Sequence, residues 1–210
     1  MKKWVGNMIE RQVIMDLCED YSQMVRLCLL ERGIKSDKTG TDLWYDFFNL
    51  QKKTINATPR STLVSEEFSC PDELLPGLNL LIDKLKPGQD VSLHLSKDAL
   101  SPTEFDGLLY DWGIYHLHLG EIIDPATGRI ERTGPVLFLK IDENSAYLIN
   151  VYNHGRGIKQ PWSMQELIQI IHNNWPSIIA KYRFPCGMSS IQRQFLYRPM
   201  KNMRCLGETE

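Results

Sequence analysis

Two histidines separated by one residue are the clearest chemical feature of the sequence. His116 and His118 lie in the alternating run Trp112-Gly-Ile-Tyr-His-Leu-His-Leu-Gly120. In an extended strand, residues i and i+2 point to the same face, so both imidazoles are expected to project together. Because imidazole exchanges protons near neutral pH, the pair is a candidate for general acid–base catalysis.

Two apolar runs downstream predict the strands that would position further side chains beside this pair. The runs cover residues 136–141 and 146–152, and the second leads directly to His154. The connection Asp142–Ser145 is short, so we expect the two runs to form an antiparallel hairpin. Three of the five histidines then lie on or beside one sheet.

The register of this hairpin decides which residues join the histidines. A three-residue loop places Lys140, Asn150 and Tyr152 together on one face. A two- or four-residue loop changes the parity and aligns Asn150 and Tyr152 with Leu137 and Leu139 instead. The sequence leaves both registers open.

The order of helices and strands over roughly residues 89–182 resembles the RelE/ParE toxin-like fold, with the pattern Gly-x-x-His-x-His…Arg…Leu-Phe…Tyr-Leu-Ile…His. In that fold two helices pack on a small antiparallel sheet, and RelE relatives cleave RNA on the open sheet face. The resemblance implies an endoribonuclease that needs no metal or other cofactor, with RNA as substrate and a protein partner such as an antitoxin. It implies catalytic side chains at His116, His118, Arg132, Tyr152 and His154. One histidine would protonate the leaving 5′ oxygen, a second side chain would take the 2′-OH proton, and Arg132 would steady the phosphate.

The charges are unevenly distributed, although the net charge is only −2. Residues 167–207 contain no Asp or Glu, and their basic side chains can approach phosphates despite an acidic body. The candidate nucleic-acid-binding residues are Lys140, Lys181, Arg183, Arg193, Arg198, Lys201 and Arg204. The alternative is a solvated tail, or one that contacts the acidic body of the same chain.

Apolar spacing predicts an α+β fold, with N-terminal helices, an antiparallel three- to four-stranded sheet and a C-terminal helix. Helical periodicity covers residues 8–32, 42–53 and 72–86, and a capping box at Ser163 opens a helix to about Asn174. Residues 61–68 read as a short strand or an extended connector. Pro87-Gly88 marks a boundary, dividing the chain into 1–88, 89–182 and a basic tail 183–210, unless all three form one domain.

Two other functions fit the same residues. The first is a non-catalytic module that binds a protein or nucleic acid, with the histidines capping a sheet edge or lining an interface. The second is a metal site, because His116-x-His118-x-x-Glu121 followed by His154 is similar to the first metal motif of cupins.

Composition indicates a cytoplasmic protein. The five cysteines are scattered without a C-x-x-C pair, which disfavours a disulfide framework or a thiolate zinc site. No apolar run approaches the roughly 20 residues needed to cross a membrane. The start of the chain lacks the apolar core of a secretory signal.

Overall fold

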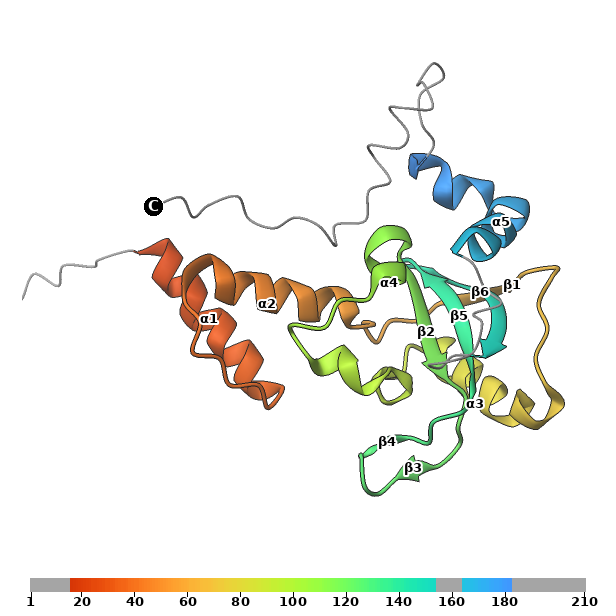
Figure 1. The fold of residues 1–210 in the computed structure, drawn as a ribbon, viewed down its shortest axis with the longest axis horizontal. Coiled ribbons are helices and arrows are strands. Elements are labelled where there is room, and N and C mark those ends of the chain that lie inside the picture. The colour runs from red at the N-terminus through yellow and green to blue at the C-terminus, as the bar shows by residue number, and fades with distance from the viewer. Residues whose placement is uncertain (1–15, 154–163, 183–210) are drawn as a thin grey trace, which may run out of the picture.

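The computed structural model describes residues 16–153 and 164–182, and it confirms the α+β class (Figure 1). The α-helices are α1 (Leu17–Glu31), α2 (Gly40–Lys53), α3 (Leu75–Leu85), α4 (Gly107–Trp112) and α5 (Met164–Asn174). The 3-10 helices are η1 (Asp72–Leu74), η2 (Ser92–His94), η3 (Lys97–Leu100) and η4 (Pro176–Tyr182). The strands are β1 (Ser61–Val64), β2 (Ile114–His118), β3 (Ile123–Asp124), β4 (Arg129–Ile130), β5 (Pro135–Ile141) and β6 (Ser145–Asn153).

The main sheet has the strand order β1-β6-β5-β2 within the described residues. β2, β5 and β6 pair antiparallel, as expected, whereas β1 pairs parallel to β6, with Ser61 opposite Ser145. The sheet is therefore mixed rather than wholly antiparallel, and the ambiguous segment after residue 60 is a strand. β3 and β4 pair with each other as a hairpin that projects from the end of β2 (Figure 1).

A β-bulge sets the register of the β5–β6 hairpin. Ile141 lies opposite Ala146, so the turn contains four residues. The pairing then shifts by one position between Phe138 and Leu139, and Phe138 lies opposite Asn150. A four-residue turn alone would place Asn150 and Tyr152 on the face of Leu137 and Leu139. The extra residue in the bulge moves them to the opposite face. Beyond the bulge, Asn150 and Tyr152 consequently share a face with Phe138 and Val136, as a three-residue loop would place them, although the turn has four residues.

Hydrophobic cores lie on both faces of this sheet. On one face α3 packs against β2, β5 and β6, and the buried members include Leu78, Leu81, Leu117, Leu137, Leu139 and Leu148. On the other face α4 and α5 pack against Ile114, Val136, Phe138 and Ile149 of the sheet, and Leu167 and Ile171 of α5 are buried there. Since α3 and β2 share a core, the expected boundary at Gly88 does not separate two hydrophobic cores.

Gly77 explains how α3 comes so close to the sheet. A Cβ atom at this position would lie 1.8 Å from the carbonyl oxygen of Leu119. Any larger residue would push the helix away from the end of β2. The glycine next to Pro76 thus serves helix packing, and the helix predicted over residues 72–86 is confirmed as η1 followed by α3.

The first two helices form a separate cluster, with a core of Val25, Leu29, Leu43, Phe47 and Leu50. α1 starts after Asp16, whose carboxylate accepts hydrogen bonds from the backbone N–H groups of Cys18 and Glu19. This is the N-cap arrangement that stabilises a first helical turn. The first residues of the helix predicted over 8–32 lie outside the described part of the chain.

Candidate functional site

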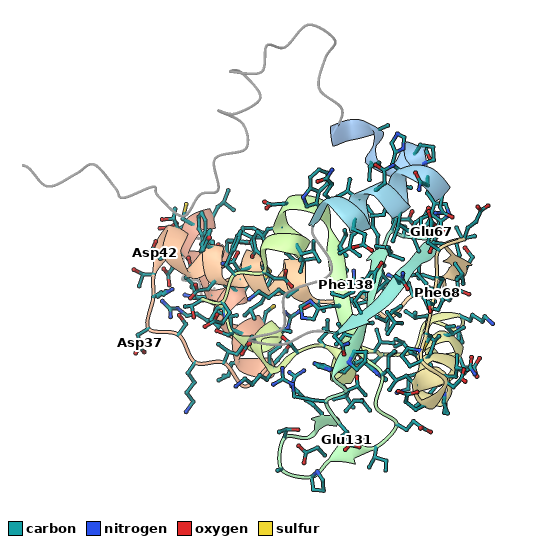
Figure 2. All side chains as sticks on the ribbon, turned by 45° about the vertical axis from the view of Figure 1, so that its right-hand side comes forward. Asp37, Asp42, Glu67, Phe68, Glu131 and Phe138 are labelled. Atoms are coloured by element: carbon teal, nitrogen blue, oxygen red, sulfur yellow. The ribbon has the colours of Figure 1, made fainter. Side chains whose placement is uncertain are left out.

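β2 places the two histidines on the sheet face that α4 and α5 cover. His116 lies opposite Phe138, and His118 lies opposite Val136. The predicted common face is confirmed, and the bulge brings Asn150 and Tyr152 onto it as well. In Figure 2, Phe138 marks the middle of this region, while Glu131 lies on the hairpin that projects below it.

His116 is paired with a carboxylate that the sequence analysis did not single out. Its Nδ1 lies 3.4 Å from Oδ2 of Asp106. The other oxygen of Asp106 accepts the backbone N–H of Leu109 at 3.1 Å, which makes Asp106 the N-cap of α4. The cap fixes the carboxylate, and the carboxylate orients the imidazole. The two side chains remain 16% and 27% exposed, so the pair lies near the surface.

His118 is much less accessible, at 4% exposed. Its backbone carbonyl accepts a hydrogen bond from Nδ1 of His94 at 2.8 Å, and Nζ of Lys84 lies 3.1 Å from the other ring nitrogen of His94. Burial lowers the pKa of His94, and the charge of Lys84 acts in the same direction. His94 is therefore neutral at pH 7. Its Nδ1–H donates to the end of β2, and its Nε2 accepts from Lys84.

Tyr152 links the sheet to α5. Its hydroxyl donates to Oε1 of Glu166 at 2.7 Å and accepts from the amide nitrogen of Asn150 at 3.0 Å. Burial, followed by the hydrogen bond to Glu166, raises the pKa of Tyr152 to about 12. The phenol remains protonated at neutral pH. It is suited to donate a proton or hydrogen bond, and poorly suited to take the 2′-OH proton.

A second polar cluster attaches the segment after β1 to the same region. The side-chain oxygen of Asn150 accepts the backbone N–H of Ser69 at 2.9 Å. The carboxylate of Glu67 accepts hydrogen bonds from the amides of Asn173 (2.8 Å) and Asn174 (2.5 Å). These amides lower the pKa of Glu67. Figure 2 shows Glu67 beside α5, so this segment and the helix cover the Tyr152 end of the face together.

The remaining predicted residues are dispersed. Nζ of Lys140 donates to the carbonyl oxygen of Trp112 at 2.6 Å, so this amine holds the end of α4 onto β5. Arg132 is exposed in the connection from β4 to β5. Lys181 belongs to η4. The other predicted positions lie outside the described residues: His154, Arg183, Arg193, Arg198, Lys201 and Arg204.

The structure shows which functional candidates the sequence analysis missed and why. Asp106 directly precedes a helix that begins with glycine, a local signal for an N-cap. That signal does not show that the carboxylate reaches a histidine ten residues later. Glu166 belongs to the predicted capping-box pattern, but its hydrogen bond to Tyr152 depends on how α5 packs on the sheet.

Within residues 16–153 and 164–182, no group of three or more His, Cys, Asp or Glu side chains is arranged to hold a metal ion. In the same part of the chain, no helix has both the length and the apolar character needed to cross a membrane. Comparisons with protein-family models, with curated proteins and with solved structures give no match to this chain.

Proposed function

We propose that the protein cleaves RNA without a metal ion and that His116, oriented by Asp106, is its principal proton-transfer residue. The pairing of these two side chains is the observation that carries the proposal. A histidine held by a fixed carboxylate is a recurrent arrangement for general acid–base catalysis. Its position near the surface is compatible with an extended, single-stranded substrate.

In the proposed reaction the 2′ oxygen of a ribose attacks the adjacent phosphorus. The bond from phosphorus to the 2′ oxygen forms, and the bond to the 5′ oxygen breaks. A base takes the 2′-OH proton, and His116 protonates the departing 5′ oxygen. The products are a 2′,3′-cyclic phosphate and a 5′-hydroxyl end, so the step balances without an added water or metal.

The other predicted residues take supporting roles in this proposal. His154 directly follows β6 in the sequence and is our candidate for the base. Arg132, exposed beside the sheet, is the candidate phosphate contact. His118 and Tyr152 are assigned to positioning, because the first is buried and the second is held by Glu166. The basic segment beyond residue 182 would bind RNA, and a toxin or defence enzyme of this type would act in the cytoplasm with an antitoxin-like partner.

The test is cleavage of mixed-sequence single-stranded RNA by the full chain in the presence of EDTA. We expect products with cyclic phosphate ends. His116→Ala should lower the rate by at least about 100-fold. Asp106→Asn should lower the rate less than His116→Ala does. Asparagine caps a helix as well as aspartate, so this variant removes the charge beside the imidazole and keeps the helix cap.

His172→Ala is the matched control, because this histidine is exposed on α5 and forms no part of the pair. It should cleave RNA at the wild-type rate. Absence of cleavage by folded wild-type protein, or equal rates for the His116 and His172 variants, would overturn the proposal.

A second candidate is a non-catalytic interaction module, and the covered sheet face favours it. α5 packs on this face, and the segment around Glu67 closes its Tyr152 end. In such a module His116 and Asp106 would only stabilise the junction between α4 and β2. Asp106→Asn and His116→Ala would then lower the free energy of unfolding, with no RNA turnover by any form of the protein.

A further inference from the structure

A pocket lies between the first two helices and the segment that leads to α4. One wall is formed by the loop between α1 and α2, residues 34–38, and the other by Pro102 and Thr103. We call this space the loop pocket. Its volume of about 490 Å³ lies in the range of pockets that bind small molecules. Such sites occur preferentially where two parts of a fold meet, as the helix pair and the segment before α4 do here.

Hydrogen bonds from side chains of α1 and α2 fix both walls of the loop pocket. Arg26 donates to the carbonyl oxygens of Ser36 at 3.0 Å and of Lys38 at 2.7 Å. Asn49 is only 9% exposed, and its amide donates to the carbonyl oxygen of Pro102 at 3.1 Å. Because these walls are already held in place, a ligand would spend little of its binding free energy on ordering them.

Apolar side chains form one part of the lining. Leu29, Ile34 and Pro102 face the pocket, and Leu29 also belongs to the buried core of the helix pair. The hydroxyl groups of Ser36 and Thr103 lie on the two opposite walls. A ligand that fits this lining has an apolar body, because only such a body gains from contact with these side chains.

The charged groups of the lining are unequal in what they offer a ligand. Asp46 is buried, and its carboxylate lies 2.8 Å from Nζ of Lys38, so its charge is already neutralised. Lys35 is exposed and has no ion-pair partner in the part of the chain that the structure describes. Asp37 is exposed, and Figure 2 shows it at the outer edge of the loop. Two ammonium groups and one outlying carboxylate thus surround the pocket, which favours an anion.

From this lining we propose that the loop pocket binds a small carboxylic acid with a short apolar body. The apolar body packs against Leu29 and Pro102, and the carboxylate contacts the ammonium group of Lys35. The inference is independent of RNA cleavage, because neither His116 nor Asp106 lines the pocket.

A bound acid would connect the α1–α2 loop to the segment that carries Asp106. Thr103 lies three residues before Asp106, and Nζ of Lys53 donates to the carbonyl oxygens of Ser101 and Glu104 on either side of it. Because the ligand touches both walls, amide hydrogen exchange in residues 101–106 should slow when it binds.

Isothermal titration of the full chain with isocaproate tests the proposal, because this acid has a branched apolar body and a single carboxylate. It should bind saturably, with a dissociation constant of about 1 mM or below. Isocaproamide has nearly the same shape without the charge. It should bind at least about fivefold more weakly.

Two rim variants should change the affinity for isocaproate in opposite directions. Lys35→Met removes the unpaired ammonium group and should weaken binding about fivefold, whereas Asp37→Asn removes the outlying carboxylate and should tighten it about twofold. Lys86→Met is the matched control, because this lysine is exposed at the end of α3 and does not line the pocket. Thr103→Trp places an indole at the rim and should abolish binding.

Absence of saturable binding up to about 20 mM isocaproate would overturn the proposal. Binding that survives Thr103→Trp would overturn it too, because the ligand would then lie elsewhere. Equal affinities for the acid and the amide, or for wild type and Lys35→Met, would exclude recognition of an anion. Circular dichroism of each variant checks that the fold is retained.

Discussion

The sheet and the first two helices bury their apolar side chains in different ways. Each face of the sheet has a helix packed on it, and residues at its centre, such as Phe138 and Leu139, are completely buried. α1 and α2 bury one side of each helix in their shared core and expose apolar residues on the other. Helices of the same chain thus cover both faces of the sheet, whereas α1 and α2 leave apolar side chains exposed to solvent.

The helix pair is attached to the rest of the molecule mainly by polar contacts. Lys53 lies at the end of α2, and its buried amine donates to the backbone carbonyl oxygens of Asp98, Ser101 and Glu104. Tyr115 on β2 donates to the carbonyl oxygen of Lys52 at 3.0 Å. A core as small as that of the helix pair contributes little stability alone. We therefore expect hydrophobic burial to dominate in the sheet and hydrogen bonds to dominate at the junction.

The largest expected effect tests the contrast between the two regions directly. Phe138→Ala removes a fully buried ring and should lower the free energy of unfolding by about 3–5 kcal/mol. Phe48→Ala, on the 56% exposed ring of α2, should cost less than about 1 kcal/mol. Urea denaturation measures both. Equal losses would remove the distinction between the regions.

An intermediate effect is expected at the junction. Lys53→Met leaves three carbonyl oxygens near residue 100 without their donor, and it should cost about 2–3 kcal/mol. Hydrogen exchange should accelerate in residues 97–104 and at the end of α2. Lys52→Met is the control: its amine is exposed, donates to Tyr110 at 3.2 Å and lies over that ring. If the two variants lose equal stability, the buried amine is not what joins the regions.

The smallest effect depends on pH and is confined to the sheet region, because residues 16–53 contain no histidine. The folded-state pKa of His94 lies below its ordinary value of 6.5. When the pH falls below 6.5, the unfolded chain takes up a proton that the folded chain does not. Stability should decrease by about 1 kcal/mol or less between pH 6.5 and 5.5.

The measurement is urea denaturation of wild type, His94→Gln and the exposed-site control His172→Gln across this pH range. The decrease should be smaller in His94→Gln and unchanged in His172→Gln. If His94→Gln loses as much stability over this pH range as wild type does, a group other than His94 causes the decrease.

The sequence predicted the elements whose patterns are local. Alternation identified β2, two apolar runs identified β5 and β6, and helical spacing identified α2 and α3 to within a few residues. β1 stayed ambiguous because four residues are too few for periodicity, and its pairing with β6 joins residues 84 positions apart. The register of the β5–β6 hairpin could not be predicted either, because the length of the turn and the bulge have opposite effects on which side chains share a face of the sheet.

The candidate site was predictable only in part, for a related reason. The common face of His116 and His118 follows from the two-residue period of a strand. Their different accessibility does not, because it depends on which elements cover each end of β2. The pairing of Asp106 with His116 likewise requires α4 to fold back against β2. RNA cleavage and the roles of Arg132 and His154 remain predictions.

The parallel pairing of β1 with β6 also has a consequence for how the chain folds. Because its partner lies 84 residues further along, β1 must wait during synthesis until most of the sheet has left the ribosome. Closing so long a loop carries a large entropic cost and slows folding relative to local pairings. The helices at the start of the chain emerge much earlier. A nascent chain therefore passes through a stage in which α1 and α2 can form their shared core while the sheet is still incomplete.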